Sequence, residues 1–194
     1  HVSYDAVSAS GVLDANEMCF GSRTLPDYKL NDADLIVSLN ADFLSTWLGS
    51  VEYMRDYAKG RKITKDNPKM TRHLQFEASM SMTGTNADER IFMKPSEEAA
   101  VLCHIYNNLT GSNVAVDSRL NEDLKKKASV VAGELKSSSN GLVLSGSNNK
   151  YIQALVNLIN VAINTSAVNY NRGVNYRSGS DSEMVQLVAD LSLI

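Results

Sequence analysis

The chain has 194 residues, of which 19 are lysine or arginine and 22 are aspartate or glutamate, so its formal net charge is −3. With 43% hydrophobic and 21% charged residues, its composition is that of a globular protein that buries a core. The weak negative charge argues against a nucleic-acid partner. No apolar run approaches the roughly 18 residues that a membrane span needs, so we expect no direct membrane insertion.

The first half of the sequence predicts alternating helices and strands. Residues 34–39 hold four apolar residues in six before a polar turn, which is typical of a buried strand. Residues 71–76 alternate polar and apolar side chains, and the irregular run 78–90 is long enough to indicate a functional or a disordered loop. Gly21 and Gly111 are expected helix stops. The other elements predicted here are a strand at 91–93 and helices at 4–20, 50–60 and 96–108.

The second half continues the alternation after a polar linker at 113–120. Asn121 is the expected cap of an amphipathic helix, and an apolar strand follows at 141–145. We expect further helices at 151–163 and 183–191, separated by a segment rich in Tyr and Asn.

Strands that alternate with helices predict an α/β fold of parallel sheets flanked by helices. We expect two lobes, each with its own sheet: a Rossmann-like lobe at 1–112 and a second α/β lobe at 121–194. The chain begins without Met and ends on an apolar run. We therefore expect an internal piece of a longer protein, with its second lobe truncated and its last helix packing against the missing remainder.

The cysteines and histidines predict no metal centre in this segment. Cys19 and Cys103 lie far apart on predicted helices, so buried free thiols are expected, with a disulfide as the open alternative. An iron–sulfur cluster needs several grouped cysteines. His73 and His104 lack the spacing of a ligand pair, and no P-loop, GxSxG, GxGxxG or HExxH motif is present.

Polar residues stand where the predicted strands end, and parallel sheets bind ligands at those carboxyl ends. Asn40 and Asp42 follow the first strand, Glu77 ends the second, and Glu98 begins the next helix. A carboxylate at the second strand end can accept both ribose hydroxyls of a nucleotide, and a later one can pair with guanine. The alternative interpretation is turn chemistry for Asn40 and Asp42 and helix capping for Glu98.

Four segments carry a resemblance to a known family: ADLIVSLNADFL at 33–44, EYMRDYAKG at 52–60, FEASMSMTGTNAD at 76–88 and KPSEEAA at 94–100. They resemble the large subunits of molybdopterin oxidoreductases, the dimethyl-sulfoxide-reductase group, with its acidic strand end, Thr…Ala-Asp loop and helix start. Residues 4–20 look closest to the iron–sulfur subunit of alternative complex III and its polysulfide-reductase-like relatives. Residues 141–164 are similar to the start of the family's third domain.

The resemblance implies a site for molybdopterin guanine dinucleotide. Glu77 would face the guanosine ribose, Glu98 would face the guanine, and the turn after the first strand would lie near the pyrophosphate. The implied cofactor-binding residues, vestigial or functional, are Asn40, Asp42, Glu77, Thr83, Asp88 and Glu98.

Two departures from the family pattern leave two interpretations. Asn40 replaces a glycine of the family, and Ser96-Glu97 replaces Gly-Thr at the helix start. In one interpretation the segment is a cofactor-free scaffold within the iron–sulfur subunit of a quinol-oxidising respiratory complex. In the other it is the dinucleotide-binding portion of an active molybdenum oxidoreductase. A free-standing nucleotide-binding module is a third hypothesis.

The resemblance also implies partners and a location. The expected partners are the remaining domains of the same chain, including an iron–sulfur domain, and membrane-bound quinol-oxidising subunits. The expected location is the periplasmic side of a bacterial inner membrane. We expect no cofactor in this segment and no redox turnover from it alone, because the metal-ligating residue and the cluster cysteines are not in it.

The scaffold interpretation makes a local prediction about the first strand end. The Asn40 side chain should fill the space that a pyrophosphate would need. Glu97 or Glu98 should pair with a nearby base, for which Lys94 is nearest in sequence.

Overall fold

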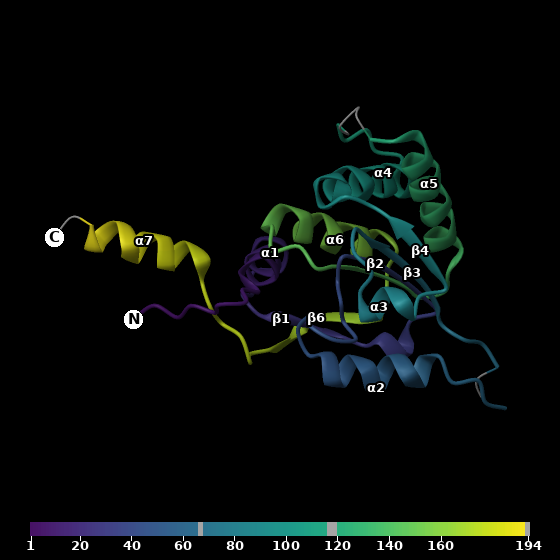
Figure 1. Ribbon diagram of the computed structural model, residues 1–194, viewed down its shortest axis with the longest axis horizontal. Coiled ribbons are helices and arrows are strands. Elements are labelled where there is room, and N and C mark those ends of the chain that lie inside the picture. Colours follow the sequence, from purple (N-terminus) through teal and green to yellow (C-terminus); the bar gives the residue numbers. More distant parts are fainter. Residues whose placement is uncertain (66–67, 116–119, 193–194) are drawn as a thin grey trace.

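A four-stranded parallel sheet forms the centre of the protein (Figure 1). The computed structural model describes residues 1–65, 68–115 and 120–192. The strand order is β4-β3-β2-β5, and every neighbouring pair is parallel. The α/β class with a parallel sheet between helices is therefore confirmed. The strands are β2 (Leu35–Leu39), β3 (Arg72–Glu77), β4 (Glu89–Phe92) and β5 (Gly141–Ser145).

The expectation of one sheet per lobe was wrong, because β5 belongs to the same sheet as β2. The two strands are in register from Leu35↔Gly141 to Leu39↔Ser145. Both strands are buried along their whole length, although β5 is an edge strand, which is the pattern of a sheet covered on both faces. The polar segment 113–120 connects two helices of one layer, and its residues 116–119 lie outside the described part of the chain.

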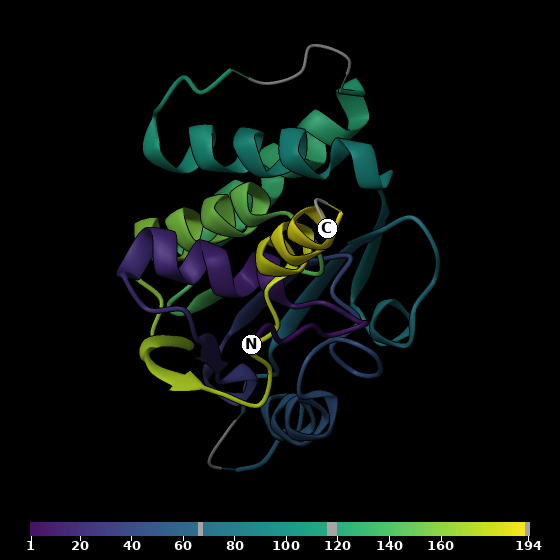
Figure 2. The same cartoon turned by 90° about the vertical axis from the view of Figure 1, so that its left-hand side faces the viewer.

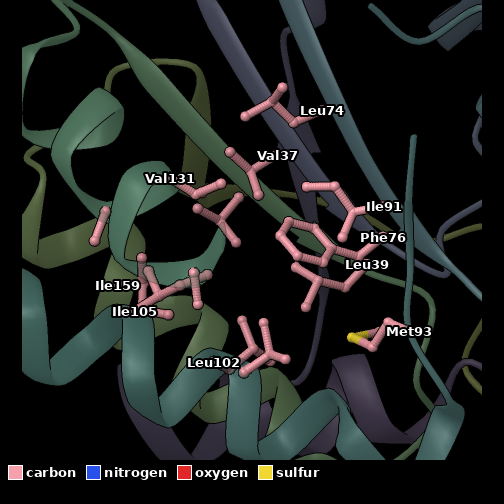
Figure 3. Packing of buried hydrophobic residues seen from close by; sticks show 14 of the residues in the cluster. Val37, Leu39, Leu74, Phe76, Ile91, Met93, Leu102, Ile105, Val131 and Ile159 are labelled. Atoms are coloured by element: carbon pink, nitrogen blue, oxygen red, sulfur yellow. The ribbon is translucent and has the colours of Figure 1, made fainter. Parts of the chain in front are cut away.

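Helices cover both faces of the sheet. Successive side chains of a strand point to opposite faces, so each face presents apolar side chains that a layer of helices buries. On one face lie α4 (Glu98–Thr110), α5 (Glu122–Ser137) and α6 (Lys150–Ala162), and on the other lies α2 (Ser50–Gly60) (Figures 1 and 2). Figure 3 shows the larger core cluster, in which the strand residues Val37, Leu39, Leu74 and Phe76 pack with the helix residues Leu102, Ile105, Val131 and Ile159. The opposite cluster contains Ile36, Leu142, Phe43, Tyr53 and Tyr57.

A two-stranded antiparallel sheet beside the centre was not expected. Its strands are β1 (Leu25–Tyr28) and β6 (Val168–Val174), the latter within the Tyr- and Asn-rich segment. β1 has only four residues, one of them Pro26, and so gives little strand signal. The first helix, α1 (Ser10–Phe20), begins six residues later than its expected start.

The other elements are short or peripheral. α3 (Met82–Thr85) is a single turn inside the irregular run, and 3₁₀ turns occupy η1 (Leu30–Asp32) and η2 (Pro95–Glu97). α7 (Asp181–Leu191) extends away from the sheet and its helices, and none of its described residues is buried (Figure 1). No helix of the described residues is long and apolar enough to cross a membrane. Cys19 and Cys103 are free thiols, but half-buried where full burial was expected.

Candidate functional site

The strand order places a topological switch point between β2 and β5. From β2 the chain crosses to β3 on one side, and it later returns to β5 on the other side. α/β proteins bind their ligands in the crevice that such a reversal leaves outside the carboxyl ends of the strands. In this chain the two residues that follow those strand ends are Asn40 and Gly146.

The two turns at the switch point touch each other. The Gly146 N–H donates to the carbonyl of Leu39 over 2.8 Å. A Cβ atom on residue 146 would lie 2.2 Å from the carbonyl oxygen of Asn40, so only glycine fits there. Asn40 itself has φ 53°, in the left-handed region that asparagine tolerates better than most residues. Backbone atoms of the two turns are therefore in direct contact at the strand ends.

The Asn40 side chain ties this contact to Glu98. Its Nδ2 donates to Glu98 Oε2 over 2.9 Å, and the hydroxyl of Ser145 donates to Oε1 over 2.5 Å. Glu98 is 3% exposed, and this burial raises the pKa of its carboxyl, although both hydrogen bonds act in the opposite direction. Ser145 was not predicted as a site residue. The sequence feature that could have indicated it is the GLVLSGSNN stretch, in which Ser145 ends a predicted strand.

One half of the local prediction at this turn stays a prediction and the other is wrong. The Asn40 side chain lies at the strand end and faces Glu98. No lysine or arginine of the described residues bonds to Glu98, whose interactions are with the neutral Asn40 and Ser145. The Glu97 carboxylate accepts from the backbone N–H of Lys94, because it caps the start of its own helix turn.

Glu77 is held by hydrogen bonds on both carboxylate oxygens. Oε1 accepts from Arg90 Nε at 2.6 Å and from the Ser81 N–H at 3.2 Å, and Oε2 accepts from the Ser81 hydroxyl at 2.6 Å. Burial acts to raise the pKa of Glu77, but the bonds from Ser81 and Arg90 outweigh it and the pKa lies below its usual value. A Cβ atom on Gly84 would lie 1.9 Å from Oε1, so α3 packs directly on the carboxylate.

A row of buried polar side chains leads along β3 to Glu77. Gln75 Nε2 donates to Glu77 Oε2 at 3.3 Å, which turns the Gln75 oxygen toward His73 Nε2, also at 3.3 Å. A carboxylate only accepts, so this order places the proton of neutral His73 on Nε2. The Tyr57 hydroxyl lies 3.0 Å from His73 Nδ1 and 2.9 Å from the Asn86 carbonyl oxygen, and its single proton can go to only one of these two acceptors. His73 is fully buried, and burial lowers its pKa to about 4.

Asp42 and Thr83 meet on the other side of the turn. Asp42 Oδ1 accepts from the N–H of Thr83 at 3.1 Å and from its hydroxyl at 2.8 Å. The same hydroxyl oxygen accepts from the Leu44 N–H at 2.9 Å. These two predicted residues therefore fasten α3 to the loop after β2.

Asp88 does not belong to this site. Its carboxylate forms two bonds with Arg61, at 2.6 and 2.9 Å, and accepts from the His73 N–H at 2.7 Å. His73 lies near the amino end of β3, four residues before Glu77, which is roughly 13 Å along an extended strand. Asp88 therefore lies apart from the other predicted residues, because the loop path between Glu77 and β4 could not be derived from sequence.

Two cavities flank the contact between the turns. The larger, of about 440 Å³, is lined by Asn40, Glu77, Ala78, Ser79, Ser81, Pro95, Glu98, Gly146 and Ser147, with no lysine or arginine among these residues. The smaller, of about 220 Å³, shares Asn40, Gly146 and Ser147 and adds Asp42, Trp47 and Arg177. The larger cavity is therefore acidic and the smaller one mixed.

Comparison with known proteins adds no relative: no family model and no curated protein matches this sequence. Within the described residues, no group of three or more histidines, cysteines or carboxylates is placed to hold a metal ion.

Proposed function

We propose that this chain is a cofactor-free scaffold portion of a molybdopterin-oxidoreductase-like iron–sulfur subunit in a quinol-oxidising respiratory complex. The observation that supports it most is the contact between Gly146 and Asn40. A ligand at the switch point needs that space and the N–H groups around it. Here the Gly146 N–H already donates to Leu39.

The lining of the larger cavity does not suit a pyrophosphate. Glu98 is the uncompensated carboxylate of this lining, since Glu77 is paired with Arg90. Two like unit charges 4 Å apart near a protein surface repel by about 4 kcal/mol. A phosphate group beside Glu98 would therefore require that Glu98 be protonated or that a base enter from elsewhere. The residues present do not fit a molybdopterin guanine dinucleotide as they are arranged.

The second candidate is that the intact protein binds molybdopterin guanine dinucleotide. In its favour, the larger cavity of about 440 Å³ brings together Asn40, Glu77 and Glu98, the residues that the resemblance implies. In this alternative the Asn40 side chain would have to release Glu98, and the two turns would have to separate.

Molybdopterin content of the full-length protein separates these candidates. The full-length protein is purified from the cells that produce it, oxidised, and assayed for the fluorescent pterin product. The scaffold role predicts no stoichiometric signal. A stoichiometric signal that Glu98→Ala abolishes and Glu97→Ala retains would overturn it. Glu97 is a matched control, because it neighbours Glu98 but is not part of the cavity lining.

Titration with GMP and GDP tests the free-standing nucleotide module. We expect no measurable heat for this chain, and micromolar binding of either nucleotide would favour the module over both oxidoreductase proposals.

The proposed partners and location are tested in cells. The tagged full-length protein should co-purify with membrane-bound quinol-oxidising subunits, and protease added to spheroplasts should reach it on the periplasmic side. Recovery without membrane subunits would contradict the proposal.

A further inference from the structure

Glu98 differs from the other carboxylates that are buried among the described residues, Asp56 and Glu77. Asp56 pairs with Arg55 and Lys59, and Glu77 pairs with Arg90. Glu98 is 3% exposed and, among the described residues, is bonded by neutral donors alone.

The buried carboxylate of Glu98 therefore keeps free hydrogen-bond acceptor positions. An ionised carboxylate offers about four acceptor sites, and Asn40 and Ser145 occupy one on each oxygen. A buried charge is costly unless it is paired with an opposite charge. Glu98 lines the cavity of about 440 Å³, so an opposite charge has a place from which to approach it.

Three exposed apolar residues, Met80, Met82 and Phe92, neighbour lining residues of this cavity in sequence or strand register and are called its rim. Met80 is 70% exposed and lies between two serines of the cavity lining. Phe92 is 61% exposed and is the register partner of Glu77 on β4, so it stands on the same face of the sheet. Met82, at the start of α3, is 55% exposed. Methionine and aromatic side chains are typical of protein interfaces, where methionine adapts to its partner's shape.

We propose that this face docks a partner polypeptide, which inserts one arginine side chain into the cavity toward Glu98 and packs apolar neighbours on Met80, Met82 and Phe92. Charge complementarity favours a basic side chain, and the apolar rim favours a polypeptide over a free cation. A planar guanidinium can bond to both free acceptor positions of a carboxylate, which a lysine ammonium does less well. This proposal rests on the scaffold role, for which it supplies the docking surface.

The probe is the tripeptide acetyl-leucyl-arginyl-leucine amide, compared with the same peptide carrying neutral citrulline in place of arginine. Binding to the 194-residue chain is followed by amide shifts in heteronuclear NMR spectra. We expect saturable shifts at Asn40, Gly146 and Ser147 with the arginine peptide, and at least tenfold weaker binding of the citrulline peptide.

Single substitutions show which side chains of the protein contact the peptide. Glu98→Gln should weaken the arginine peptide at least tenfold, whereas Glu97→Gln should leave its affinity unchanged. Phe92→Ala, on the surface, should weaken it severalfold without affecting folding, and so tests the rim even if Glu98→Gln folds poorly. Absence of binding, equal binding of both peptides, or shifts confined to another surface would overturn the proposal. Molybdopterin in the full-length protein would instead refute the scaffold role, so the two failures are distinguishable.

Discussion

Acidification should destabilise the fold through His73. Its pKa is about 4 in the folded protein against an ordinary value of 6.5, because the imidazole is buried. The folded pKa is the lower one, so the unfolded chain takes up the proton first. Stability is unaffected above pH 6.5 and falls as the pH decreases from 6.5 to 4. The difference of 2.5 units at 1.36 kcal/mol each amounts to about 3 kcal/mol.

Urea unfolding followed by circular dichroism, at steps from pH 8 to pH 4, measures this loss. The comparison is with His73→Gln, whose amide can hydrogen-bond to Gln75 and Tyr57 but does not titrate. Glu77 and Asp88, whose pKa values lie below normal, also lose their stabilising effect in acid, but they do so in both proteins. The wild type should therefore lose about 3 kcal/mol more than the variant between pH 7 and pH 4.

An equal loss in the two proteins would refute this reasoning. It would mean that the imidazole is accessible to solvent in the folded state, or that its proton is shared with a neighbouring group. The charged and titratable groups around it are Tyr57, Arg61, Asp88 and Glu77.

Three further predictions concern single contacts. Gly146→Ala should lower the free energy of unfolding by about 1–3 kcal/mol, because its Cβ would meet the Asn40 carbonyl oxygen at 2.2 Å; an unchanged melting temperature would show that the turns can separate freely. Arg90→Ala should cost about 3 kcal/mol at pH 7 by leaving Glu77 without its base, and the cost should shrink as the pH falls through the lowered pKa of Glu77; a pH-independent cost would point to packing alone. Asn149→Ala should cost about 1 kcal/mol, because its side chain accepts from the Tyr151 N–H at the start of α6, whereas loss of the neighbouring Lys150 side chain should cost little in chemical denaturation.

The parts of the fold that were predictable are those encoded by neighbouring residues. The apolar runs of β2 and β5 are bounded by turn residues, and their strands appear where the sequence indicates. Gly21 and Gly111 adopt φ of 75° and 73° directly after their helices. Asn121 caps α5 by accepting from the Asp123 N–H.

The parts that were not predictable depend on register between distant segments. The bond from Asn40 to Glu98 spans 58 positions, and it exists because β2 and α4 meet at the same end of the sheet. The alternation of β3 predicts a strand but not that its polar face is covered: His73 and Gln75 are fully buried beneath α2 and α3. Periodicity is the same for a solvated polar face and a buried hydrogen-bonded one.

The pairing of β2 with β5 has a consequence for how the chain folds. Leu35 and Gly141 are register partners although 141 − 35 = 106 positions separate them. Closing so large a loop has an entropic cost before any contact of β5 compensates it, which slows folding. During synthesis, β2 can pair with β3 as soon as residues up to Glu77 are available, but its other edge stays open until β5 emerges. An open edge of apolar strand residues is a template for pairing with other chains. Nascent chains of this protein are thus most prone to aggregation while they end between α2 and β5.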